Sequence, residues 1–190
     1  MKNLFYLLLV VLISGCSLKQ ELNDINSYSI DFSSKNSYKN TEKSILIEEP
    51  LVNKSFNSRS IFYSQKPYLF EEYAKNRWIN LPSNMIHNSL LESFQSSKMF
   101  SLVSFTDTKI KYDYVLKTNV IKLYHEINEN KSYVILKINF DLLKDEKLVK
   151  TFSYDKKVLV KENKPYEFVN SLNKSLEEIV EELLKELNNL

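Results

Sequence analysis

The chain has 190 residues, a formal net charge of +2 at pH 7 and 43% hydrophobic residues. This length fits one globular domain, and the nearly balanced charge excludes the strongly basic surface that is typical of nucleic-acid-binding proteins. The only glycine, Gly15, lies near the N-terminus, so the rest of the chain has no glycine-rich loop for a nucleotide phosphate.

The first sixteen residues contain the parts of a secretory signal. Lys2 provides a positive tip, residues 4–13 form an uninterrupted apolar run, and Ser14 and Gly15 are small residues before a cleavage point. The apolar run is shorter than the roughly 20 residues that a transmembrane helix needs. We therefore expect residues 1–15 to be a signal peptide.

Residues Ile13-Ser14-Gly15-Cys16 also resemble a bacterial lipobox, in which cleavage falls before the cysteine and its thiol is lipidated. The alternative is a plain signal peptide with a chance cysteine, which would leave a secreted protein with one unpaired thiol. A diacylglycerol thioether and an N-acyl chain on Cys16 account for that thiol. They would anchor the chain to a membrane without spanning it. We expect no disulfide and no other cofactor.

The next part of the chain is polar. Residues 16–43 are rich in Asn, Ser and Lys, which predicts a lipidated N-terminus followed by a polar tether, with one strand-like stretch at 28–32. Residues 44–190 are predicted to form one periplasmic α+β domain. Its first strands are expected at 44–48 and 60–64, followed by a short aromatic segment at 68–73.

Helical spacing begins after Pro82, which suits the first turn of a helix predicted over about 81–98. Its apolar side chains recur every fourth residue and share one face. Beside them runs a row of serines, which would let the helix approach a sheet closely: Ser89, Ser93 and Ser97. A strand is expected at 100–105.

Three longer segments alternate between apolar and polar residues, at 112–124, 133–143 and 148–160. The alternation predicts strands with one buried face, and the short polar turns between them predict an antiparallel meander. The alternation changes phase in the first segment, which predicts a bulge near Val120. Apolar residues at helical spacing then predict an amphipathic helix over 165–187 that lies across the sheet, with a coiled coil as the alternative.

No residues form a recognisable catalytic or metal-binding pattern. His87 and His125 are the only histidines, and neither has the spacing of a metal ligand set. The chain has no nucleophile elbow and no spare thiol, and its glutamate runs are typical of solvated faces. We therefore expect a protein that is not an enzyme.

The abundant aromatic residues are a second candidate signal. They favour a packed core over a lipid groove, because aromatic residues are enriched in strands for packing reasons. Arg77 and Trp78, with Tyr73 close before them, stand directly ahead of the first helix. They form either a packing anchor or an exposed interaction feature, since both Arg and Trp are enriched at interface hot spots.

The order of these segments resembles the ABC-type transport auxiliary lipoprotein family, the outer-membrane partners of MCE-domain lipid transporters such as the Pqi system. The resemblance covers about residues 27–187 and is most specific over 61–103. Its components are the lipobox, a strand ending at Pro50, the Ile-Phe-Tyr strand at 61–63, the Tyr73, Arg77 and Trp78 segment, the helix after Pro82, the meander and the last helix. Ile79 departs from the small residue that is usual after the tryptophan.

This resemblance implies a non-enzymatic lipoprotein on the periplasmic face of the outer membrane. Ser17 is consistent with that location, because it is not the Asp that retains many lipoproteins at the inner membrane. The implied partners are an MCE-domain protein and ABC transporter subunits, with phospholipid and a homo-oligomer as further options. The alternative function is a structural or regulatory lipoprotein that docks on an outer-membrane assembly or a cell-wall synthesis complex.

Overall fold

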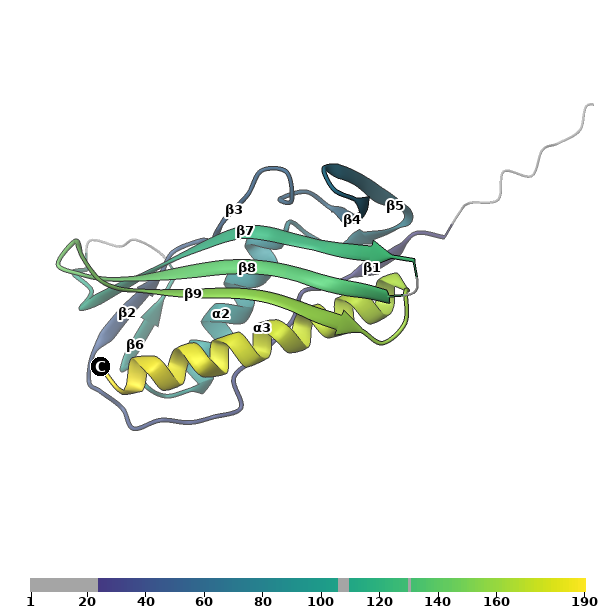
Figure 1. Cartoon of the computed structure of the whole chain (residues 1–190). Coiled ribbons are helices and arrows are strands. Elements are labelled where there is room, and N and C mark those ends of the chain that lie inside the picture. The colour runs from purple at the N-terminus through teal and green to yellow at the C-terminus, as the bar shows by residue number, and fades with distance from the viewer. Residues whose placement is uncertain (1–23, 106–109, 130) are drawn as a thin grey trace, which may run out of the picture.

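The computed structural model describes residues 24–105, 110–129 and 131–190, and shows two helices packed on a mixed sheet (Figure 1). The predicted α+β class is confirmed. No helix in these ranges has an apolar stretch long enough to cross a membrane. The elements in chain order are β1 (Asn26–Tyr28), β2 (Ser44–Ile47), β3 (Leu51–Val52), β4 (Ser60–Lys66), β5 (Leu69–Trp78), α2 (Pro82–Ser96), β6 (Leu102–Ser104), β7 (Tyr114–Asn128), β8 (Lys131–Lys144), β9 (Lys147–Val160) and α3 (Pro165–Asn188).

Strands β7, β8 and β9 form the antiparallel meander that the alternating segments predict. The even-numbered positions of β8 from Val134 to Leu142 are buried, while most of the odd-numbered ones are half-exposed on the opposite face. The pairing of β7 with β8 shifts between Val120 and Lys122, where a bulge was predicted. The bulge is required because the buried positions of β7 change there from even to odd numbers.

Strand β7 connects the meander to the rest of the sheet. One of its edges pairs with β8, and the other pairs in turn with β2, β3 and β4, which all run parallel to it. Strand β6 adds to β2, while β5 and then β1 add to β4. Strand β5 has ten residues, where the sequence predicted only a short aromatic segment at 68–73.

Helices α2 and α3 cover one face of this sheet (Figure 1). Ile86, Leu90 and Phe94 of α2 belong to the same core cluster as Leu172 and Leu176 of α3 and the inward side chains of the meander. Helix α3 contacts β8 and β9 along its length of about 36 Å. Its apolar side therefore packs on the sheet, as predicted, and not in a coiled coil.

Residues 29–36, which we name the N-terminal strap, run in an extended conformation along α2. The amide of Ile30 lies 3.4 Å from the Met85 sulfur. Two residues on, the amide of Phe32 donates to Ser89 Oγ at 3.3 Å. A further two residues on, the amide of Ser34 donates to Ser93 Oγ at 3.2 Å. Every second amide of the strap thus meets every fourth residue of α2.

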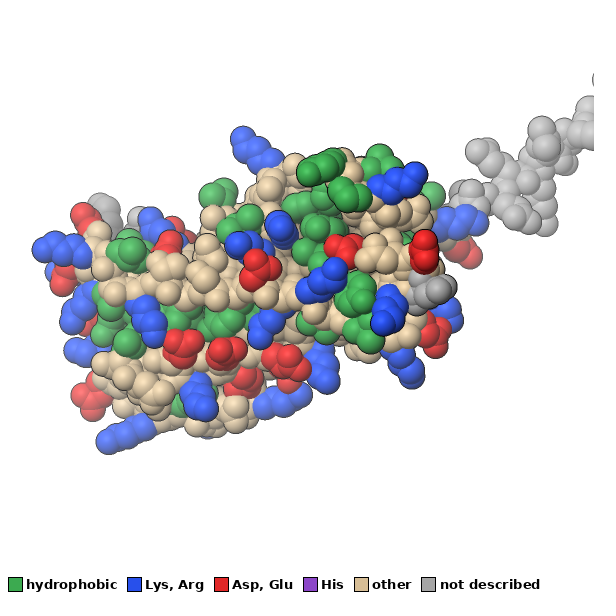
Figure 2. Space-filling model, viewed as in Figure 1, with side chains coloured by type: hydrophobic (Ala, Val, Ile, Leu, Met, Phe, Trp, Pro, Cys, Tyr) green, Lys and Arg blue, Asp and Glu red, His purple; other side chains and the backbone are tan. Residues whose placement is uncertain are grey.

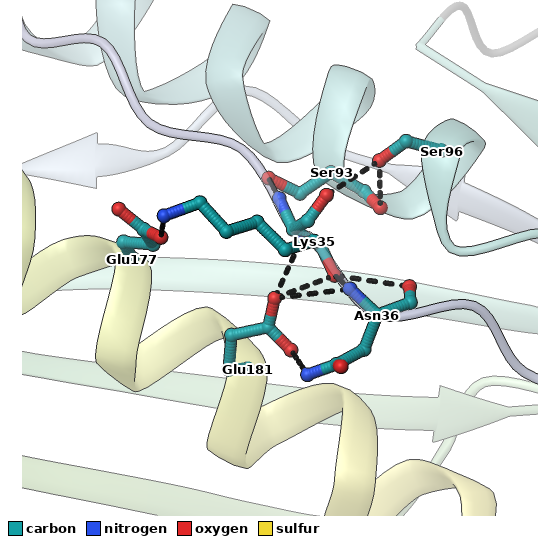
Figure 3. A network of polar contacts seen from close by, with 7 residues as sticks. Lys35, Asn36, Ser93, Ser96, Glu177 and Glu181 are labelled. Atoms are coloured by element: carbon teal, nitrogen blue, oxygen red, sulfur yellow. Dashed lines mark hydrogen bonds and ion pairs between the residues drawn. The ribbon is translucent and has the colours of Figure 1, made fainter.

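The other edge of the strap is held by α3 (Figure 3). The amide of Asp31 donates to Asn173 Oδ1 at 3.1 Å, and the amide of Lys35 donates to Glu181 Oε1 at 2.5 Å. Glu181 Oε1 also accepts from Ser34 Oγ at 3.0 Å, and the Lys35 ammonium pairs with Glu177. Residues 173, 177 and 181 again recur every fourth residue, so the strap joins the two helices along matching rows.

The strap changes the expected organisation of the N-terminal region. Residues 16–43 were expected to form a polar tether, but the part that the structure describes, residues 24–43, contributes β1 and packs on the domain. Ile30 and Phe32 are 2% and 5% exposed and belong to the core. The serine row of α2 was expected to face a sheet closely, and Ser89 and Ser93 instead bind the strap backbone.

Replacing Glu181 tests how much the strap stabilises the domain. We expect Glu181→Ala to lower the free energy of unfolding by about 1.5–3 kcal/mol, because charge-assisted hydrogen bonds to the strap are lost. Urea unfolding measures this difference. Glu178 is exposed on the same helix, so Glu178→Ala is the matched control and should change stability by less than about 0.5 kcal/mol. Equal effects of the two substitutions would contradict a stabilising role for the strap contact.

Candidate functional site

Cys16, the predicted lipidation site, lies outside the described residues. Strand β1 begins at Asn26, so nine residues separate Cys16 from the sheet. Ten Cα steps span at most about 36 Å when fully extended. A lipid on Cys16 would therefore hold the domain close to the membrane surface.

The predicted anchor residues Tyr73, Arg77 and Trp78 all lie on β5, which places Arg77 and Trp78 on opposite faces. Trp78 is 1% exposed, and its ring lies 6.4 Å from that of Phe168 at the start of α3. Arg77 is exposed, and its Nε donates to Ser27 Oγ of β1 at 3.4 Å. The structure therefore assigns packing to Trp78 and leaves Arg77 on the surface.

Tyr73 takes part in a polar contact inside the core. Its hydroxyl lies 2.8 Å from Nδ1 of His125, which is fully buried and stacks on the Phe168 ring at 4.8 Å. His125 Nε2 has no hydrogen-bond partner among the described residues. Burial lowers the pKa of His125 to about 4 and raises the pKa of Tyr73 well above its usual value, with Tyr63 as a secondary cause. The contact is therefore between a neutral imidazole and a neutral phenol.

On the opposite face of the sheet, four side chains form what we name the aromatic cluster: Phe56, Phe62, Phe70 and Tyr124. The ring of Phe70 lies 5.0 Å from Tyr124 and 5.7 Å from Phe56, both edge-on. Phe56 also stacks on Tyr124 at 5.8 Å and is 7% exposed. Edge-on and stacked pairs at these distances are favourable beyond the burial of their area. The cluster packs the side chains of the β4–β5 hairpin against Tyr124 of β7.

An open cleft of about 660 Å³ lies against the aromatic cluster. Pro67 and Tyr68 of the hairpin line it together with Lys66, Lys122 and Glu126. Figure 2 shows hydrophobic side chains gathered where the hairpin lies over the sheet, with Lys and Arg side chains around them. The cleft offers apolar surface and two ammonium groups and no nucleophile–base pair. Its chemistry suits binding of an amphiphile or an apolar segment.

We did not predict this hairpin from the sequence, although Pro67 was a signal for it, because it stands between the strand expected at 60–64 and the aromatic segment at 68–73. The loop has two residues, since Lys66 pairs with Leu69. Two-residue hairpin loops usually carry Gly or Asn at the position with positive φ. Here Tyr68 occupies that position, with a φ of 69°, so the usual sequence signal for the turn is absent.

The remaining candidates for chemistry make structural contacts. His87 Nε2 lies 2.9 Å from the carbonyl oxygen of Ile47. Among the described residues, no three His, Cys, Asp or Glu side chains gather in the manner of a metal site. Two glutamates of α3, Glu177 and Glu181, bind Lys35 of the strap.

Comparison with known proteins identifies the fold. The sequence matches no protein-family model and no curated protein. Protein XCC0632 from Xanthomonas campestris, described as DUF330, superposes with a TM-score of 0.72 at 15% identity, covering 84% of this chain and 92% of that chain. An uncharacterized protein superposes with a TM-score of 0.71 at 11% identity, covering 86% of this chain and 99% of that chain. The domain therefore shares its fold with both.

Substitution at neighbouring β5 positions tests the assignment of packing to Trp78. We expect Trp78→Ala to lower the free energy of unfolding by about 3–5 kcal/mol, because a large buried ring is lost. Arg77→Ala should change it by less than about 0.5 kcal/mol, since the side chain is exposed. Urea unfolding of both variants measures the difference. A small effect of Trp78→Ala would contradict the packing role.

The buried imidazole predicts a pH dependence of stability. The unfolded chain binds a proton on His125 near its ordinary pKa of 6.5, whereas the folded protein does so only near 4. The contribution of His125 to the free energy of unfolding is therefore fully present above pH 6.5. It is lost as the pH drops from 6.5 through 4, which lowers the free energy of unfolding by about 3 kcal/mol.

A double variant isolates this contribution. Tyr73→Phe with His125→Phe keeps a ring against Phe168 and leaves no phenol without a partner, so the loss of stability between pH 6.5 and 4 should shrink. Urea unfolding at several pH values measures it. His87→Gln retains His125 and should behave like the unmodified protein. If the double variant loses as much stability on acidification as the unmodified protein, His125 is not the group responsible.

Proposed function

We propose that this chain is a membrane-anchored envelope lipoprotein that acts as a non-enzymatic auxiliary component of an MCE-type ABC lipid transport system. Its place would be the periplasmic face of the outer membrane. The observation that carries the proposal is that the folded domain begins only a few residues after the lipobox in the chain. The strap begins thirteen residues after Cys16 and binds both helices.

Several further features support the proposal. Residues 61–103, over which the family resemblance is most specific, contain β4, β5 and α2, and therefore the hairpin and Trp78. The polar contacts of the described residues stabilise the fold, which favours a binding role over a catalytic one. The open cleft beside the aromatic cluster adds an apolar surface for a protein or lipid partner.

Affinity capture tests the proposal. The full-length protein with a C-terminal tag, expressed in its native host and cross-linked before solubilisation, should recover an MCE-domain protein or its ABC permease and ATPase. Mass spectrometry identifies the recovered proteins. The matched control is Cys16→Ala, which should incorporate no labelled fatty acid and recover these partners at least tenfold less.

Two results would count against the proposal. Recovery of cell-wall synthases or another envelope assembly, without transporter subunits, would favour the alternative docking function. Incorporation of labelled fatty acid into Cys16→Ala would show that the lipobox prediction is wrong.

A further inference from the structure

The turn of the β4–β5 hairpin has an unfavourable residue at its most demanding position. We name residues 66–70 the hairpin tip. Lys66 pairs with Leu69, and Pro67 and Tyr68 are the two residues between them. A proline followed by a residue with positive φ is the pattern of a type II turn, which favours Gly or Asn at the second position. Tyr68 adopts a φ of 69° there, although a bulky residue is disfavoured in this region.

Tyr68 contributes almost no packing to the folded domain. The side chain of Tyr68 is 99% exposed, and Leu69 and Phe70 beside it are 46% and 45% exposed. Among the described residues, the Tyr68 side chain has no hydrogen-bond, ion-pair or ring partner that would compensate for its unfavourable backbone. A residue that is strained and exposed together indicates a binding role, because neither property stabilises the domain.

The hairpin tip is firmly mounted. Phe70 packs edge-on against Tyr124 and Phe56, and Phe56 in turn lies 6.1 Å from Phe62. These contacts hold one side of the Phe70 ring against the sheet, while Tyr68 and Leu69 beside it are exposed. The tip therefore presents apolar side chains at a fixed place on the surface.

The topology puts this tip on the side from which the chain arrives. Strand β1 runs parallel to β5, with Asn26 opposite Asn76, and β5 begins at the tip. The chain consequently enters β1 from the end of the sheet at which the tip lies. Leu69 lies seven residues along β5 from Asn76, or about 23 Å. The residues between Cys16 and Asn26 reach about 36 Å, so a bilayer that holds Cys16 is within reach of the tip.

We infer that the hairpin tip inserts into the interfacial region of the same bilayer that holds the lipid on Cys16. Tyr68 suits the headgroup level, because its ring is apolar and its hydroxyl can stay hydrated. Leu69 and Phe70 provide the apolar contact, and the Lys66 ammonium can reach lipid phosphates while its stem lies along the acyl boundary. This inference rests on the lipid anchor of the proposed function and is independent of its transport partners.

With a lipid anchor on Cys16, a small apolar contact is sufficient for the tip to bind the bilayer. A short linker gives the tip an effective concentration at the bilayer in the millimolar range, so weak insertion becomes well populated. Two attachments, the lipid and the tip, would fix the orientation of the domain. Leu148, near the turn between β8 and β9, lies at the opposite end of strands about 45 Å long and would face away from the bilayer.

A single fluorescent label tests the insertion. Cys16 is the only cysteine, and its thiol is blocked when it is lipidated. Leu69→Cys therefore adds one reactive thiol at the tip, and Leu148→Cys adds one at a site that is 61% exposed in the unmodified protein. Each full-length lipoprotein is labelled with an environment-sensitive nitrobenzoxadiazole and reconstituted into vesicles of phosphatidylethanolamine and phosphatidylglycerol. The mass of the N-terminal peptide verifies the lipid.

The two labels should differ clearly. We expect emission at position 69 to rise at least threefold in vesicles and to be quenched by lipids with a nitroxide near the headgroup, while position 148 stays unchanged. Adding Tyr68→Gly to Leu69→Cys should reduce the rise to the level of position 148. Tyr68→Gly alone should leave the melting temperature equal or higher, because glycine tolerates positive φ.

Four outcomes would overturn the inference. The label at position 69 could remain as water-exposed as that at 148. Its emission could rise with protein density and without nitroxide quenching, which would identify a second copy of the chain as the occupant. Tyr68→Gly could lower the melting temperature, which would assign Tyr68 to folding. A chain without lipid on Cys16 would remove the anchor and the inference together. Failure to capture transporter subunits would overturn the proposed function alone.

Discussion

The fold depends on a match between two repeats. An extended chain advances about 6.6 Å in two residues, and an α-helix advances about 6.0 Å in four. Alternate amides of the strap can therefore meet successive rows of α2 and α3 over three contacts before the mismatch accumulates. The strap donates its amides to Ser89 and Ser93 on one edge and to Asn173 and Glu181 on the other. Those polar side chains lie beside the core, where unpaired groups would be costly, so the strap and the two helices stabilise one another.

The local half of this fold could be predicted from the sequence, and the non-local half could not. Alternation over 133–143 identifies β8 because a strand with one buried face has a period of two. The parallel pairing of β2, β3 and β4 with β7 leaves no such local trace, because it joins residues about 60–70 positions apart. The strap was missed for a related reason. Its composition is that of a tether, and only Ile30 and Phe32 indicate that it enters the core.

The same division applies to the candidate sites. Arg77 and Trp78 could be singled out by residue type, but only the direction of each side chain on β5 separates a surface residue from a core one. The contact of Tyr73 with His125 joins residues 52 positions apart, which no pattern in the sequence predicts. The hairpin turn was not predicted, because Tyr68 stands where the usual turn signal would be a glycine.

The strap also sets how far the domain could lie from a lipid on Cys16, the anchor in the proposed function. If residues 24–43 were a free tether, the chain between Cys16 and β2 would reach about 100 Å. With β1 paired to β5, only nine residues lie between Cys16 and the sheet, and ten Cα steps span at most about 36 Å. Under the proposed lipid anchor at Cys16, a partner would have to meet the domain within this distance of the membrane. Together with the proposed lipid anchor, this geometry suits a component that stays at a membrane surface, with the long axis of the sheet available to point away from the bilayer.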